Sequence, residues 1–147
     1  MHVKDILKLE LGSSISIFNE PFTYVGHAQI ELDGGHTIRW LYDDEGRMLA
    51  VAPQEEELIL FRELDEEVEP EDEMILLQGK EHEFSYEDAG NIIEIEVECP
   101  VDDEDRLMFS DYQAPGGGIV RLIENENTGE SVGYVGVHVS DDDVTEM

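Results

Sequence analysis

Alternation of apolar with polar residues is the feature that most constrains what this chain can fold into. Ala28, Ile30 and Leu32 are each followed or preceded by a polar residue. The same period of two occurs at 14–17, 37–42 and 93–98. Successive side chains of a strand point to opposite faces, so each run predicts a strand with one buried face and one wet face. The segment 58–61 is apolar on both faces, which predicts a central, better covered strand.

Turn-forming sequences separate these runs. They contain Gly, which adopts positive φ easily, and Asp or Asn, whose side chains bond to their own backbone. They lie at 33–35, 43–46, 115–118 and 127–129. Short strands with such spacing predict an antiparallel, mainly β architecture. No predicted strand alternates with a long helical segment, which argues against a doubly wound α/β fold.

The first residues have a different period. Val3, Ile6, Leu7 and Leu11 fall at helical spacing before Gly12, so the segment 2–11 predicts a short N-terminal helix. We expect this helix to cover one end of a β core. The alternative is a docking helix for a partner or a membrane surface.

The strands fall into two halves with the same order of aromatic and apolar runs. We predict an N-terminal helix with a first β repeat at 1–64, and a second β repeat at 74–139. Dense carboxylates make 65–73 an acidic linker and 140–147 an acidic, frayed tail. The predicted fold is two related antiparallel sheets packed as a sandwich or partly open barrel, because neither half has enough core alone.

The charge balance is strongly negative. Asp and Glu number 38 against 8 Lys and Arg, giving a net charge of -30 over 147 residues. Nucleic acids and anionic membranes are polyanions, so they are disfavoured as partners. Three explanations stay open: adaptation to a salty cytoplasm, a surface for a basic partner, or solubility alone. We expect no membrane insertion and a cytoplasmic location, because no apolar run is long enough to span a bilayer.

Motifs for catalysis or metal binding are not found. His27 and His36 could face each other across a hairpin, but two histidines make half a metal site at best. The carboxylate runs at 43–45, 102–105 and 141–143 lack the ligand spacing of an EF-hand. The single cysteine, Cys99, shares a predicted inner face with Ile95 and is expected to be a core residue. We therefore expect no catalytic residue, no metal site and no cofactor.

Several short segments resemble the YjfK-like family of uncharacterised bacterial proteins. They lie at 5–12, 24–32, 39–46 and 134–139. The resemblance covers most of the chain and offers no catalytic residues to transfer. Members are often encoded beside relatives of phage shock protein A, so the resemblance implies an accessory role in bacterial envelope stress.

Together these observations favour a non-enzymatic, acidic interaction protein. We expect the negative surface to attract a basic protein partner, with Trp40, Tyr42 and Tyr112 providing contacts at an exposed sheet edge. Core packing is the alternative role for these aromatic residues. One alternative is a small-molecule or metal-binding enzyme of unrecognised type, with a site between the two β halves near His27, His36 or His138. A purely salt-adapted structural domain is the third possibility. The sequence leaves the oligomeric state open.

Overall fold

The computed structural model describes residues 1–97 and 105–147, and over these ranges the chain is almost entirely β. One helix, α1, spans Val3–Ile6, and two 3₁₀ helices span Pro53–Glu55 and Asp141–Asp143. The strands are β1 (Ser14–Ile17), β2 (Glu20–Leu32), β3 (Thr37–Asp43), β4 (Arg47–Ala52), β5 (Glu57–Glu63), β6 (Met74–Leu77), β7 (Lys80–Val97), β8 (Arg106–Gln113), β9 (Ile119–Asn125), β10 (Ser131–Val139) and β11 (Val144–Glu146). The predictions of a mainly β chain and a short N-terminal helix are confirmed, although α1 ends well before residue 11.

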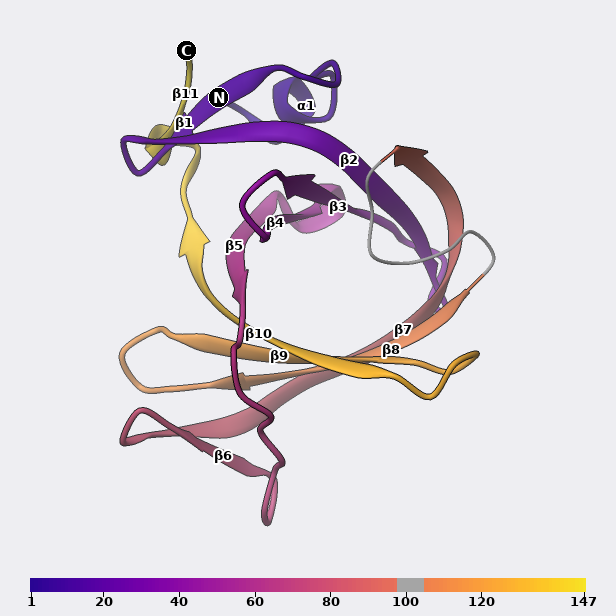
Figure 1. Ribbon diagram of the computed structural model, residues 1–147, viewed down its shortest axis with the longest axis vertical. Helices are drawn as coiled ribbons and strands as arrows, with labels where there is room; N and C mark the ends of the chain where they lie inside the picture. Colours follow the sequence, from indigo (N-terminus) through magenta and orange to yellow (C-terminus); the bar gives the residue numbers. More distant parts are fainter. Residues whose placement is uncertain (98–104) are drawn as a thin grey trace.

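The strands form a closed barrel (Figure 1). Eight of them follow one another in the order β2-β3-β4-β5-β10-β9-β8-β7, and β7 then pairs with β2 to complete the ring. Every pairing is antiparallel. The expected sandwich or partly open barrel of two sheets is therefore wrong, because the edges of the two halves pair with each other instead of stacking face to face.

Closure depends on the two longest strands. Residues from Gly26 to Leu32 in β2 pair with residues from Gly90 to Val97 in β7. At Gly90 the strands approach so closely that a Cβ atom would collide with the carbonyl oxygen of Glu31 and lie 2.9 Å from the Cα of Leu32. Glycine is required here because it alone leaves that space.

One large cluster of buried residues lines the barrel interior. In it Trp40 on β3 and Phe109 on β8 meet edge to face, with ring centroids 5.6 Å apart. The other buried members are Ala28, Ile30, Leu32, Ile38, Tyr42, Met48, Ala50, Ile59, Phe61, Ile92, Leu107, Ile119, Ile123 and Tyr134. The interior is therefore mostly apolar, with several aromatic rings from different strands.

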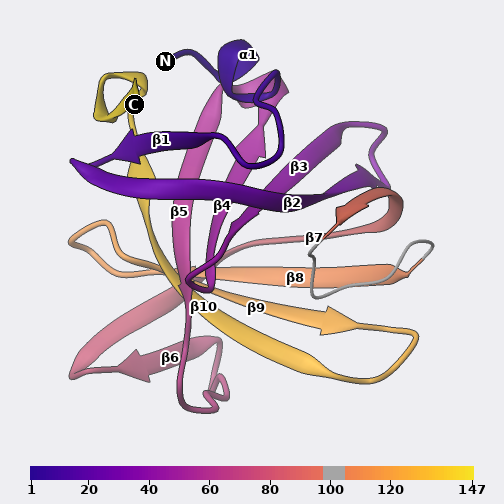
Figure 2. The same cartoon turned by 45° about the horizontal axis from the view of Figure 1, so that its top comes forward.

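Two smaller layers cover the outside of the barrel. In the first, α1, β1 and β11 lie together over one side (Figure 2), where Ile6, Ile15 and Val144 are buried. In the second, Ile75 of β6 packs with Tyr112 and outer residues of β9. The C-terminal tail is thus an ordered strand paired with β1, which corrects the expectation that it frays.

The residues that alternation predicts to face inward are buried, with one exception in β7. Leu58, Ile59 and Phe61 of β5 are buried, which confirms a well covered strand between β4 and β10. In β7, however, a register shift opposite Gln29 and Ile30 places Ile92 inside, at 2% exposure, and leaves Ile93 outside, at 47%. A β-bulge inserts one extra residue and exchanges the faces.

Each half of the chain supplies four barrel strands, β2–β5 and β7–β10, and an irregular acidic connection joins β5 to β6. This order is compatible with the predicted domain boundaries. The duplication itself stays a prediction.

Candidate functional site

The barrel interior contains two cavities, of about 620 Å³ and 220 Å³. Trp40 belongs to the wall of both. The larger volume lies within the range of small-molecule sites, which is about 300–1,000 Å³. It is therefore the best candidate for a binding site among the residues that the structure describes.

Aromatic and apolar side chains form the buried wall of this larger cavity. Trp40 is 1% exposed, Tyr134 6% and Tyr42 7%. The exposed lining residues include two carboxylates, Glu63 and Glu130. The remaining lining residues are Val25, Asp43, Gly46, Arg47, Leu107, Ile123, Asn125, Ser131 and Val132. An apolar wall with a few polar groups is typical of ligand pockets.

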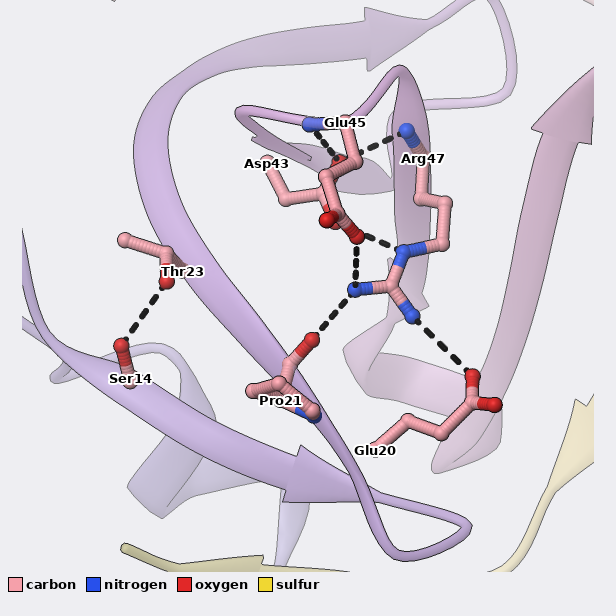
Figure 3. A network of polar contacts seen from close by, with 7 residues as sticks. All are labelled: Ser14, Glu20, Pro21, Thr23, Asp43, Glu45 and Arg47. Carbon is pink, nitrogen blue, oxygen red and sulfur yellow. Dashed lines mark hydrogen bonds and ion pairs between the residues drawn. The ribbon is translucent and has the colours of Figure 1, made fainter.

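A buried ion pair, Asp43 with Arg47, forms one side of the cavity (Figure 3). The Arg47 Nε donates a hydrogen bond to Asp43 Oδ2 over 2.7 Å, and the Arg47 backbone N–H donates to Asp43 Oδ1, also over 2.7 Å. Asp43 also accepts a bond from the backbone N–H of Glu45. The carboxylate thereby holds the β3–β4 turn and the arginine together, and Gly46 completes the turn with a φ of 79°.

The guanidinium of Arg47 has further neighbours. Its Nη2 donates to the carbonyl oxygen of Pro21, and the exposed carboxylates of Glu20 and Glu45 lie 3.7 Å and 3.5 Å away. It also stands 5.7 Å from the ring centroid of Phe22. Arg47 is the only Lys or Arg in the described lining of the cavity, and these contacts engage it fully. It is therefore not available to neutralise an anionic ligand.

One polar atom in the wall lacks a partner. The Nε1 of Trp40 is buried and makes no hydrogen bond to any residue that the structure describes. Leaving a buried donor unpaired costs about 1–3 kcal/mol.

The smaller cavity lies beside a second buried ion pair. Arg121 of β9 donates to both oxygens of Asp111 on β8, over 2.6 Å and 2.8 Å. Its guanidinium is also 4.7 Å from the ring centroids of Phe61 and Phe109. Arg121 is thus held between two aromatic rings and a carboxylate, where it serves packing and charge compensation inside the barrel.

Tyr86 also lines the smaller cavity. Burial, together with the hydrogen bond that its hydroxyl donates to Asp88, raises the pKa of Tyr86 well above its usual value of 10.0. The phenol is therefore neutral at physiological pH and acts as a donor. His138, Glu55 and Glu57 line this cavity too, so one of the three histidines considered for an enzyme site lines a cavity together with carboxylates.

The other two histidines do not share a site. His27 is 4% exposed and bonds to the Tyr24 hydroxyl and to Glu94, at 3.0 Å from the latter. His36 is exposed and lies 3.7 Å from Glu55. Within residues 1–97 and 105–147, no three His, Cys, Asp or Glu side chains are grouped so as to hold a metal ion. Cys99 and most of the 102–105 run lie outside the described residues.

The three aromatic residues expected at an exposed sheet edge are buried. Trp40 is 1% exposed, and Tyr42 and Tyr112 are each 7% exposed. They belong to β3 and β8, which have neighbours on both sides. Trp40 and Tyr42 line the larger cavity, whereas Tyr112 packs outside the barrel against β6. The exposure on which their expected contact role depended is not found.

Sequence reasoning missed the two Asp–Arg pairs. For Asp43 and Arg47, the available signal is an aspartate at the end of a strand, a Gly turn and an arginine that begins the next strand. For Asp111 and Arg121, the residues are ten positions apart. Only the register of β8 with β9 brings these two together.

Comparison with known proteins places the chain in a family without assigning a role. No curated protein and no solved structure matches the chain significantly. None of the described helices is long and apolar enough to cross a membrane. Residues 10–141 match the domain of unknown function DUF4178. Because this match covers most of the 147 residues, the chain belongs to the DUF4178 family.

Proposed function

We propose that this domain is a non-catalytic binding module that holds a small organic ligand in the larger cavity of its barrel. The observation that carries the proposal is a cavity of about 620 Å³ with apolar and aromatic side chains in its wall. A closed barrel supports such a site because its strands hold the wall rigidly while one end admits the ligand.

The described lining of this cavity favours binding over nucleophilic catalysis. Its described lining contains no histidine, cysteine or lysine, and its one serine, Ser131, is exposed. Nucleophilic catalysis requires a nucleophile within hydrogen-bond reach of a base. We therefore place the domain among accessory proteins that carry or sense a ligand.

A neutral fluorescent probe tests this function. Phenylnaphthylamine becomes bright in apolar cavities, and Trp40 is the only tryptophan in the chain, so energy transfer from Trp40 reports a probe held nearby. We expect saturable binding with such transfer. The substitution Val132→Phe fills the cavity wall and should abolish it, whereas Val137→Phe, at an exposed position outside this cavity, should not. No binding, or equal binding to both variants, would refute the proposal.

A second candidate function is the recruitment of a basic protein partner. It is favoured by the state of the arginines: Arg39, Arg47, Arg106 and Arg121 are all held by hydrogen bonds within the protein. Few cations are therefore left to neutralise the 38 carboxylates. Such a surface would steer a cationic partner.

We propose that such recruitment would take place in the cytoplasm and would serve bacterial envelope stress, as the sequence led us to expect. A pull-down from bacterial lysate at low and at moderate salt tests it. Specific recovery of a basic protein that weakens as salt rises would support it, and recovery of none would count against it.

A further inference from the structure

We infer that the larger cavity selects an organic cation: an amine with an apolar body. This inference rests on the proposed binding function and names the ligand class for the same site. It follows from two properties of the wall, which are the charge at its exposed side and its apolar and aromatic surface.

The charge at the exposed side favours a cation. Asp43, Glu63 and Glu130 line the cavity, and Arg47 is the one opposing charge, which leaves a net charge of -2. Asp43 and Arg47 neutralise each other over 2.7 Å. The uncompensated charges are therefore the exposed Glu63 and Glu130. The net charge of -30 on the whole chain adds a field that concentrates cations and repels anions.

The aromatic wall favours the same class. Trp40, Tyr42 and Tyr134 line the cavity from β3 and β10. The faces of aromatic rings attract ammonium groups, and indole does so most strongly. Leu107, Ile123 and Val132 complete an apolar surface that would cover the body of the ligand. A small inorganic cation would leave this surface unused, so an organic cation fits better.

Four compounds of similar size separate these requirements. Phenoxypropylamine carries the cation and an ether oxygen, phenoxypropanol lacks the charge, phenoxybutanoate reverses it, and phenylbutylamine replaces the oxygen with a methylene. Binding is followed by the fluorescence of Trp40 and by calorimetry at about 0.15 M salt, where distant charges are screened. We expect phenoxypropylamine to bind about tenfold more tightly than the alcohol, and about as tightly as phenylbutylamine, which keeps the charge and the apolar body. We expect no binding of the carboxylate.

Matched variants distinguish attraction by the carboxylates of the cavity from attraction by the negative charge of the whole surface. Glu63→Gln with Glu130→Gln should weaken the amine about tenfold and leave the alcohol unchanged. Glu31→Gln with Glu81→Gln removes the same charge from exposed positions outside the cavity and should change neither.

The outcomes separate this inference from the proposed function. If phenylnaphthylamine binds but the amine shows no advantage over the alcohol or the carboxylate, the ligand class is wrong and the binding function stands. If the two double glutamine variants weakened binding of the amine equally, the inference would also be overturned, because the attraction would then come from the whole surface. If neither phenylnaphthylamine nor any of the four compounds binds, the binding function itself fails.

Discussion

Removing the carboxylate of Asp111 should destabilise the protein far more than removing an equally well bonded carboxylate on the surface. Asp111 and Arg121 are both 5% exposed, and two hydrogen bonds of 2.6 Å and 2.8 Å join them. In Asp111→Ala the guanidinium stays between Phe61 and Phe109 without a counter-charge. Breaking a buried pair in this way costs about 3–5 kcal/mol.

The surface offers a matched control. Arg106 donates to both oxygens of Asp33 over 2.9 Å and 2.6 Å, but these side chains are 36% and 52% exposed. Water compensates the loss of such a pair, so Asp33→Ala should cost far less than Asp111→Ala. For a domain of this size the buried substitution would lower the melting temperature by about 10 °C, and the exposed one by much less.

Urea unfolding measured by the fluorescence of Trp40, and independently by circular dichroism, gives both free energies of unfolding. The double variant Asp111→Ala with Arg121→Met removes the unpaired charge and keeps an apolar chain between the rings. We expect it to recover to within about 1 kcal/mol of the natural protein. Two results would show that the barrel interior does not isolate this pair from water. One is that Asp111→Ala costs no more stability than Asp33→Ala. The other is that the double variant loses as much stability as the two single variants lose together.

Three further predictions follow from the closure, the charge and the tyrosines. Gly90→Ala should lower the free energy of unfolding by about 3 kcal/mol because its Cβ meets the backbone of β2; Gly34→Ala, which meets nothing within 4 Å, is the control in thermal melts. Added salt should raise the free energy of unfolding at constant pH, since it screens a net charge of -30; a flat dependence in urea titrations would contradict this. Folding raises the pKa of Tyr86, so the fold favours the neutral phenol. The stability that this adds is fully present below pH 10.0 and is lost as the pH rises toward the higher pKa of the folded state. Tyr86→Phe should therefore lose less stability than the natural protein between pH 10.0 and about 12, and an equal loss in both would refute this assignment.

The strands were predictable from the sequence, but the closure of the barrel was not. Alternation identifies which side chains face inward, and it does so equally for a sandwich and for a barrel. Whether the outer edges meet depends on the length of β2 and β7 and on the room that Gly90 leaves between them. The bulge that exchanges Ile92 with Ile93 is likewise a property of pairing, which a single strand does not encode.

The candidate site was predictable only in part. The sequence singled out Trp40 and Tyr42 but placed them outside, because a period of two indicates that they share a face and not which face is covered. The cavity is the space that inward side chains leave unfilled, so it depends on the packing of several strands at once. The surplus of carboxylates was plain, whereas the pairing of Asp43 and Asp111 with arginines required the register of the strands.

Position decides what each carboxylate of this chain can do. Those inside the barrel, Asp43 and Asp111, are bound to arginines and contribute to the architecture. Those on the outer faces lie in water, where salt screens them and where they act mainly as a collective field. Glu63 and Glu130 belong to neither group, because they are exposed and yet line a cavity with an aromatic wall. An attraction that is diffuse over the rest of the surface can become selective here, where a cation would meet two carboxylates and a low-dielectric wall together.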